Sequence, residues 1–385
     1  MSATADKPFT IAMVAGEASG DNLGAALIIA LKTQHPHIRF VGIGGTNMIA
    51  EGFESFQDME TLSVNAFPVM RVPELIKILL STKKAILDSK PDCFIGIDYN
   101  FFNGFLEGMM KRAGLATVHY VSPTIWAWRS GRIRKIKKHI DLMLTLYPFE
   151  TEIYKTHGIP VLFVGHPKAR EIDLDQGDRD KSAARASLGL ANDERVVAIL
   201  PGSRAGEVAL IGPDFFRTAA ILHKELSCKF VIPANNDKRA QQINALWQIL
   251  VPEIPVQITD SSITAMSAAD TVLVKSGTAT LEAMLLRRPM VMSYRLSNLA
   301  YALVSRLVNA DYFALPNILA GSALVPEFIQ DEATPEVLAA AMIKIICHPQ
   351  EDLLSQFADI HQQLRGDSGA VAANQILQLC RHVSH

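Results

Sequence analysis

Small residues, hydroxyls and a carboxylate follow one apolar run of this sequence, in the order Ser276, Gly277, Thr278 and Glu282. The preceding run, 271–274, is typical of a strand, and the segment that follows has helical periodicity. A strand, a small-residue turn and a helix start form an anion site, because free backbone N–H groups and the helix dipole point at the bound group. Glu282 lies where it would reach hydroxyls beside a bound phosphate. The pattern is suited to binding a nucleotide sugar. The alternative is an ordinary helix N-terminus that is capped by Ser276 or Thr278.

A second candidate pair in the same half of the chain follows the apolar run 195–200. Ser203 and Arg204 lie in the turn after it, and they would face the same site as the first motif. Arg204 offers a charge-assisted, forked pair of hydrogen bonds to a diphosphate, although a structural ion pair is the alternative. Asn317, in the turn-rich stretch 311–317, is a further candidate ligand contact.

Carboxylates follow two apolar runs in the first half of the chain. Asp98 comes directly after the run 93–97 and is a candidate general base, with a turn residue as the alternative. Asn100 and Asn103 follow and would orient sugar or phosphate groups. The run 9–15 ends in a turn whose glycines would let the backbone approach a ligand closely and whose polar side chains would contact it. The alternative is a tight strand-to-helix turn with a capping side chain. The residues of this turn are Gly16, Glu17, Ser19, Gly20 and Asp21.

A basic segment with tryptophans follows the apolar run 116–121. Isoleucines recur at helical spacing between its cations. A basic amphipathic helix beside tryptophan is typical of binding to an anionic membrane surface, and a solvated helix face is the alternative. The residues expected to contact the membrane are Trp126, Trp128, Arg129, Arg132, Lys135 and Lys138. The stretch 67–72, which is followed by lysines, is a second candidate for this surface.

Strand-like and helix-like segments alternate along the whole chain, which predicts parallel sheets with crossover helices. The alternation pauses at 165–182, where 171–180 is polar and acidic like a linker, and it then restarts. We therefore expect two α/β halves joined near residue 170, followed by a helical segment from 335 to 380. Ligands of open parallel sheets bind outside the carboxyl ends of the strands, so the motifs of both halves would line one cleft.

The bulk properties exclude several classes of function. Apolar residues make up 49% of the 385 residues, and the net charge of −2 argues against a nucleic-acid partner. The four cysteines are scattered and have no metal-ligand spacing, so we expect no metal site and free thiols in a reducing compartment. The sequence has no secretion-signal core and no apolar run of ~18 residues, so we expect a soluble protein or one that lies on a membrane.

Together and in order, these motifs resemble the lipid A disaccharide synthases, bacterial glycosyltransferases of lipid A and lipopolysaccharide biosynthesis. The matching motifs cover nearly the whole chain, and such an ordered set is far more specific than any single motif. They are Val14–Asp21, Ile95–Asp98, His119–Arg129, Tyr147–Glu150, Val164–Pro167, Leu200–Glu207, Ser276–Met284 and Leu315–Gly321.

The resemblance implies a GT-B fold, in which two Rossmann-like parallel-sheet domains face each other across a cleft. It places an acceptor and membrane-facing domain at 1–168 and a UDP-sugar-binding domain at 169–345. A helical segment at 346–385 would pack back on the first domain or be exchanged in a homodimer. The implied reaction is inverting transfer from UDP-2,3-diacylglucosamine to 2,3-diacylglucosamine 1-phosphate (lipid X), with release of UDP. It needs no metal or other cofactor and takes place at the cytoplasmic face of the inner membrane, on which the protein is peripheral.

The resemblance also implies roles for individual residues. Asp98 matches the family's proposed base, and Glu17 is a second catalytic candidate beside it. The donor contacts are Ser203, Arg204, Ser276, Gly277, Thr278, Glu282 and Asn317. The acceptor and N-terminal loop contacts are Gly16, Ser19, Asp21 and Asn103.

The chain departs from the family pattern in two loops. After Asp98 the family usually has Ala-Pro-Asp-Phe-Asn, whereas residues 99–103 are Tyr-Asn-Phe-Phe-Asn. The chain therefore lacks the second aspartate of the family pattern and any role that depends on it. The loop 65–70 also differs, and we expect it to affect acyl-chain preference.

Three alternative functions remain at this stage. Another UDP-N-acetylglucosamine-type transferase or epimerase of the same fold would accept unacylated sugar. A nucleotide-dependent oxidoreductase would need the motif GxGxxG, which the sequence lacks. A non-catalytic membrane-binding module would not need polar motifs at so many strand ends.

Overall fold

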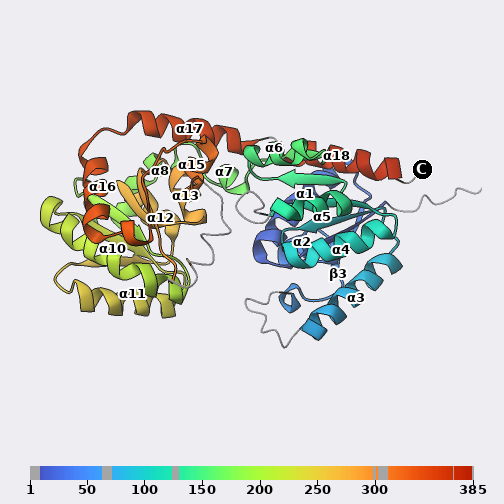
Figure 1. The fold of residues 1–385 in the computed structure, drawn as a ribbon, viewed down its shortest axis with the longest axis horizontal. Helices are drawn as coiled ribbons and strands as arrows, with labels where there is room; N and C mark the ends of the chain where they lie inside the picture. The colour runs from blue at the N-terminus through green and yellow to red at the C-terminus, as the bar shows by residue number, and fades with distance from the viewer. Residues whose placement is uncertain are drawn as a thin grey trace, which may run out of the picture. The chain divides into compact units, whose positions relative to one another are not determined.

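The computed structural model of the chain describes residues 9–62, 72–123, 130–297, 301, 311–366 and 368–383. They form two compact α/β units (Figure 1). The first unit contains the chain up to Pro167 together with the segment from Gly366 onward, and the second runs from Lys168 to Arg365. The predicted class, two α/β halves each built on a parallel sheet, is confirmed.

The sheet of the first unit has seven parallel strands in the order β3-β2-β1-β4-β5-β6-β7. Strand order therefore reverses between β1 and β4, the two neighbours at the middle of the sheet. The strands are β1 (Thr10–Ala15), β2 (Arg39–Ile43), β3 (Phe53–Ser55), β4 (Cys93–Ile97), β5 (Ala116–Tyr120), β6 (Leu142–Thr145) and β7 (Val161–Phe163).

Helices cover both faces of this sheet, which is why its strands are continuous apolar runs. Ile11 and Met13 of β1 face α1 (Ala18–Gln34) and α18 (Ser368–Val383), which lie side by side (Figure 1). Ala12 and Val14 face α3 (Val72–Asp88) and α4 (Asn100–Arg112). The remaining α-helices of this unit are α2 (Thr46–Ala50), α5 (Ile133–His139) and α6 (Pro148–Thr156), with 3₁₀ turns at Met59–Thr61 and Ser130–Arg132.

The second unit repeats this design with six parallel strands in the order β10-β9-β8-β11-β12-β13. Here strand order reverses between β8 and β11. The strands are β8 (Val196–Leu200), β9 (Lys229–Pro233), β10 (Val256–Thr259), β11 (Thr271–Lys275), β12 (Met290–Tyr294) and β13 (Glu327–Ile329).

The helices α10 (Ala205–Leu226), α11 (Asp237–Leu250) and α16 (Pro335–Cys347) pack on one face of the second sheet. The helix α13 (Thr278–Leu285) packs instead with α12 (Ser262–Ala268), α15 (Leu315–Ala320) and α17 (Glu351–Arg365). The shorter elements are α7 (Pro167–Glu171), α8 (Gln176–Arg179), α9 (Lys181–Ser187) and a 3₁₀ turn at Gln330–Glu332. The helical prediction for the C-terminal segment is confirmed, with α17 in the second unit and α18 in the first.

The segment 171–180 is not the linker that its polar composition indicated. It contains α8, and Gly177 packs closely against the C-terminal end of α13. An added Cβ at Gly177 would lie 2.0 Å from the Leu286 carbonyl oxygen. Asp178 Oδ1 accepts a 2.9 Å hydrogen bond from Arg288 Nη1. The acidic side chain, itself 59% exposed, therefore pairs with a buried arginine of the second unit.

Candidate active site

In the first unit, two carboxylates follow the neighbouring strands β1 and β4, where strand order reverses. Glu17 is the exposed N-cap residue of α1, and Asp98 comes directly after β4 and is partly buried. The ring of Tyr99 packs against Gly16, where an added Cβ would lie 2.5 Å from the ring. Burial and the nearby charge of Glu17 raise the pKa of Tyr99 above its ordinary value. Gly16 therefore gives room for an aromatic side chain in this structure.

The backbone holds Asp98 in an uncommon conformation. Asp98 and Tyr99 have φ angles of 50° and 46°, a left-handed region that costs non-glycine residues about 1–3 kcal/mol each. The Asp98 N–H donates to the Tyr120 carbonyl at 2.7 Å, and the Tyr99 N–H donates to Asp98 Oδ1 at 2.8 Å. Only a network of bonds holds such a conformation, and this network presents Asp98 at the carboxyl edge of the sheet.

Asn103 belongs to this network and is completely buried. Its amide nitrogen donates to the carbonyl oxygens of Asp98 at 2.8 Å, Val14 at 3.1 Å and Ile97 at 3.2 Å. The structure thus places Asn103 beneath the end of β4, where its amide nitrogen binds backbone carbonyls, whereas the sequence analysis expected it to orient sugar or phosphate groups.

Asp21 is also buried, and its carboxylate holds the loop after β2. It accepts hydrogen bonds from the backbone N–H groups of Gly45 at 2.8 Å, Asn47 at 2.9 Å and Met48 at 3.0 Å. These bonds cap α2 instead of the helix on which Asp21 stands. Ser19, two residues earlier in the chain, is exposed, as is Glu17.

The helices α3, α4 and α5 carry exposed apolar and basic side chains on the first unit. Helix α4 lies between α3 and α5 (Figure 1). Four large apolar side chains of α3 and α4 are half or more exposed: Ile76, Leu80, Phe101 and Phe105. On and beside α5, Arg132, Lys135 and Lys138 are exposed, while Ile133 is buried in the core. Trp126, Trp128 and Arg129 lie outside the described residues, as does most of the stretch 67–72.

In the second unit, a pocket of about 440 Å³ lies at the carboxyl ends of β8 and β11. It brings together six residues that the sequence selected: Ser203, Arg204, Ser276, Gly277, Thr278 and Glu282. Five further polar residues line it and were missed: Glu207, Asn235, Asp260, Ser262 and Lys275. The predicted convergence of the two strand-end motifs on one site is thus present within this unit.

Lys275 and Glu207 form an ion pair at the floor of this pocket, with 3.0 Å between Nζ and Oε1. Glu207 Oε2 also accepts the backbone N–H groups of Ser203 at 3.1 Å and Arg204 at 3.3 Å. Burial alone would raise the pKa of Glu207, but the hydrogen bond and charge of Lys275 outweigh burial and lower it. By contrast, the Arg204 side chain is 82% exposed, 4.0 Å from Glu207, and free to turn toward a ligand.

The first turn of α13 lines the pocket, and its N-cap residue is Gly277, with φ 150°. Neither hydroxyl that the sequence offered as a cap is the N-cap residue: Ser276 Oγ donates to the Phe313 carbonyl at 3.1 Å, and Thr278 is exposed. Glu282 accepts a 3.3 Å hydrogen bond from Ser262 Oγ. Burial raises the pKa of Glu282 above its ordinary value, and the charge of Lys168 partly opposes this.

Asn317 does not line the pocket. It is buried, and its amide nitrogen donates to the Val325 carbonyl at 2.9 Å and to Glu327 at 2.7 Å. Its amide oxygen accepts the N–H groups of Leu324 and Val325, both at 2.8 Å. Three of these hydrogen bonds anchor the loop after α15 and the fourth joins the side chain to Glu327 of β13, so both polar atoms of the amide are already paired within the protein.

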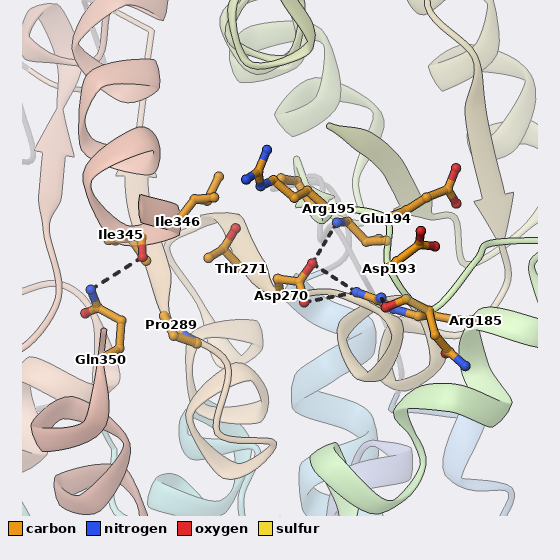
Figure 2. A pocket seen from close by; sticks show the side chains of 13 residues that line it. Arg185, Asp193, Glu194, Arg195, Asp270, Thr271, Pro289, Ile345, Ile346 and Gln350 are labelled. Carbon is orange, nitrogen blue, oxygen red and sulfur yellow. Dashed lines mark hydrogen bonds and ion pairs between the residues drawn. The ribbon is translucent and has the colours of Figure 1, made fainter. Parts of the chain in front are cut away.

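A second pocket of about 350 Å³ lies at the opposite, amino edge of the same sheet (Figure 2). There the buried Arg185 guanidinium donates two 2.9 Å hydrogen bonds to the carboxylate of Asp270. Asp270 also accepts Lys181 Nζ at 2.6 Å and the Val196 N–H at 2.8 Å. These bonds join α9 to the starts of β8 and β11, and they give this pocket a structural role.

Within the residues that the structure describes, no helix is long and apolar enough to cross a membrane. The same residues contain no cluster of three or more His, Cys, Asp or Glu side chains arranged to hold a metal ion.

Comparison with known proteins decides the family. The family model described as lipid-A-disaccharide synthetase matches residues 11–376. The chain belongs to the lipid-A-disaccharide synthase family. It is 46% identical over 374 residues to the lipid-A-disaccharide synthase of Pseudomonas aeruginosa (strain UCBPP-PA14), covering 96% of this chain and 97% of that protein. The corresponding synthase of Azotobacter vinelandii is 48% identical over 375 residues, with the same coverage.

Solved structures confirm the GT-B fold that the family resemblance implied. UDP-GlcNAc 2-epimerase from Neisseria meningitidis, bound to UDP-GlcNAc, aligns with a TM-score of 0.63 at 12% identity over 96% of this chain and 99% of that one. MurG from Acinetobacter baumannii aligns with a TM-score of 0.57 at 14% identity over 97% and 100%. These likenesses concern the fold alone. The activity class comes from the family: as a member of the lipid-A-disaccharide synthase family, the chain is a glycosyltransferase.

The hydrogen bonds of Asn317 predict a structural effect of its removal. Asn317→Ala should lower the free energy of unfolding by about 2–4 kcal/mol, because buried backbone groups lose their partners. Denaturant unfolding followed by circular dichroism measures this. Asn235→Ala, an exposed asparagine of the same unit, should change stability by less than about 0.5 kcal/mol. Equal stability of the two variants would contradict the anchoring role.

Proposed function

We propose that the chain transfers a diacylglucosamine unit from UDP-2,3-diacylglucosamine to the six-position hydroxyl of 2,3-diacylglucosamine 1-phosphate, with inversion at the anomeric carbon. The observation that carries this proposal is the pocket of the second unit, in which Arg204, Lys275 and the first turn of α13 surround one space. Membership of the lipid-A-disaccharide synthase family supports the acylated substrates.

The donor's diphosphate would bind at the start of α13. Backbone N–H groups at a helix start and nearby cations stabilise negative charge, and that charge grows on the diphosphate as UDP departs. Arg204 is exposed and unconstrained enough to close on the phosphates, and Lys275 supplies a fixed positive charge below them. Glu282, half-buried beside Ser262, would accept hydrogen bonds from the ribose hydroxyls.

Asp98 would act as the base in the first unit. The acceptor hydroxyl attacks the anomeric carbon while its proton passes to the Asp98 carboxylate, and the bond from that carbon to UDP breaks. The strained backbone at Asp98 supports this assignment, because such conformations concentrate at functional sites. Glu17, exposed at the end of the neighbouring strand, would bind the acceptor sugar or share the role of base.

The acylated substrates would approach from a membrane. The exposed apolar side chains of α3 and α4, beside the basic α5, form a surface suited to the interface of an anionic membrane. We propose that the protein binds the cytoplasmic face of the inner membrane through this surface.

A single assay tests the proposed reaction. UDP release is measured with acylated and with unacylated UDP-glucosamine, each with and without 2,3-diacylglucosamine 1-phosphate. We expect UDP release only with the acylated donor and the acceptor together. Turnover of the unacylated donor at an equal rate would favour a general UDP-sugar transferase or epimerase instead.

Replacing the proposed base should affect turnover far more than donor binding. Asp98→Asn should lower kcat by about 10²–10⁴-fold, the usual scale for loss of a general base, while the Kd for UDP stays within twofold. Steady-state kinetics and calorimetric titration with UDP measure the two effects. Near-normal turnover by this variant would remove Asp98 from the role.

Replacing Arg204, by contrast, should mainly weaken donor binding. Arg204→Ala should weaken UDP binding about ten- to hundredfold, because hydrogen bonds between charged groups contribute about 1.5–3 kcal/mol. Arg217→Ala is the matched control, since Arg217 is exposed on α10 and pairs only with Asp214 among the described residues. Unchanged UDP affinity and unchanged kcat in Arg204→Ala would contradict the donor-site assignment.

The membrane surface is tested by charge reversal. Changing Arg132, Lys135 and Lys138 to Glu should abolish most sedimentation with anionic vesicles, since each cation contributes about 1 kcal/mol near such a surface. A variant with Arg217, Lys224 and Lys238 changed to Glu has the same net charge but leaves α5 intact, and it should still sediment. Equal sedimentation of both variants would indicate that α5 is an ordinary solvated helix face.

A further inference from the structure

The first two turns of α11 bind the backbone that carries Arg204. Strand β9 lies beside β8 and leads into α11, so α11 begins at the carboxyl edge of the sheet, next to the turn after β8. Helix α11 then runs beside α10 (Figure 1). One side of α11 is buried in the core of the unit through Trp247. Arg239 and Gln242, three residues apart and therefore on one side of the helix, are only partly buried and have no part in the mechanism above.

Both side chains bind backbone carbonyl groups, one on each side of Arg204. Arg239 Nε donates to the Ser203 carbonyl oxygen at 3.2 Å, and Gln242 Nε2 donates to the Ala205 carbonyl oxygen at 3.0 Å. The Arg239 guanidinium also donates to the side-chain oxygen of Gln242, so the two side chains form one bridge from α11 to the turn. Ser203 and Arg204 line the donor pocket, and the bridge therefore ends at the wall of that pocket.

The turn needs such bonds because it contains a glycine. Gly202 has φ 112°, a conformation that favours glycine, and an added Cβ would lie 2.5 Å from Glu207 Oε2. Glycine loses more conformational freedom on ordering than any other residue, so a turn that contains it is costly to fix. Fixing the turn before the ligand arrives removes that cost from the free energy of binding.

The bonds to this turn fix its backbone and leave the side chain of Arg204 available. Glu207 Oε2 accepts the N–H groups of Ser203 and Arg204, while α11 binds the carbonyl groups on either side. The Arg204 carbonyl accepts the N–H groups of Glu207 and Val208, both at 3.1 Å. The Arg204 side chain is nevertheless 82% exposed. A fixed backbone with an exposed guanidinium suits a residue that must meet a ligand at a defined place.

The use of an arginine on α11 is also informative. The Arg239 guanidinium binds a carbonyl oxygen and an amide oxygen, which are both neutral, so its charge is not needed for these bonds. What arginine offers over other donors is a planar, rigid fork that binds two partners in fixed directions. The bridge therefore depends on the geometry of the guanidinium, which a lysine does not reproduce.

We propose that Arg239 and Gln242 are positioning residues for the donor site: their bridge to the turn 203–205 holds Arg204 where its guanidinium meets the diphosphate of the donor. Neither residue touches the substrate in this role, since both act through the backbone of the turn. This inference rests on the proposed function, in which Arg204 binds the diphosphate. It adds to the site two residues of a helix that the motifs at the strand ends did not indicate.

A double-mutant cycle on UDP binding tests whether Arg239 acts through Arg204. Arg239→Ala should weaken UDP binding about three- to tenfold, the scale of a lost positioning contact. In the Arg204→Ala background the same change should alter the Kd for UDP by less than about twofold, because no guanidinium is left to position. Calorimetric titration of the four proteins with UDP measures the coupling. Equal losses of affinity in both backgrounds would overturn the proposal.

Three further variants separate positioning from charge. Arg239→Lys keeps the positive charge but loses the planar fork, so it should weaken UDP binding nearly as much as Arg239→Ala. Gln242→Ala changes no charge and should weaken UDP binding about two- to fivefold. Lys238→Ala removes an exposed cation next to Arg239 and should bind UDP normally. Full affinity in Arg239→Lys would show that only the charge matters, which would overturn the proposal.

A stability control separates positioning from folding. Thr334 Oγ1 caps α16 in the same unit by accepting the Val337 N–H at 3.3 Å, so Thr334→Ala should lower stability without changing the Kd for UDP. In turnover, Arg239→Ala should raise KM for the donor and leave KM for the acceptor unchanged, a split that lower stability alone does not produce. An equal rise in both KM values would count against a role at the donor site.

Failure of the proposed function looks different from failure of this inference. If the acylated donor is not turned over but UDP still binds, the function fails, and the cycle on UDP binding still decides the role of Arg239. If Arg204→Ala itself leaves UDP binding unchanged, the donor-site assignment fails, and the proposed role of Arg239 fails with it.

Discussion

The two candidate sites depend on one constraint, the divergence of the helices that follow two neighbouring parallel strands. In the first unit, β1 leads into α1 on one face of the sheet and β4 leads into α4 on the other. The ends of these strands are then left uncovered, and Glu17 and Asp98 lie there. In the second unit, β8 leads into α10 and β11 into α13, which pack with different sets of helices. Because the faces of each sheet are mostly apolar, such edges offer polar side chains a place to gather.

Burial separates two kinds of polar residue that look alike in sequence. Asp21, Asn103 and Asn317 have the side chains expected of ligand contacts, yet each one binds the backbone of a loop. Loops at a sheet edge need such anchors, since their buried N–H and C=O groups cannot be left unpaired. Both roles select short side chains with several hydrogen-bonding groups, so one sequence alone does not distinguish them.

The strands that could be predicted are those of four or more residues, because a continuous apolar run is visible only at that length. β3, β7 and β13 have three residues each and were missed. The segment 171–180 was interpreted as a linker because its main partner, Arg288, is 110 residues from Asp178 in the chain. Ser276 directly follows β11 and Arg204 lies in the turn four residues after β8, so both were predicted from the ends of apolar runs. Lys275 was missed because it is the last residue of β11 and looks like part of the strand.

The two helix starts at the edge of the second sheet are not equivalent. At α10 the N–H groups of Ser203 and Arg204 already bind Glu207, whose carboxylate occupies the position that a phosphate would take. Lys275 Nζ lies 3.0 Å from Oε1 of that carboxylate and holds it in place. The start of α10 is therefore already paired with a negative charge of the protein itself. The start of α13 follows Gly277, which has no side chain to occupy it. An anion entering this pocket would meet the start of α13, with the exposed Arg204 beside it, and this asymmetry between the two helix starts is why we propose that the diphosphate binds at α13.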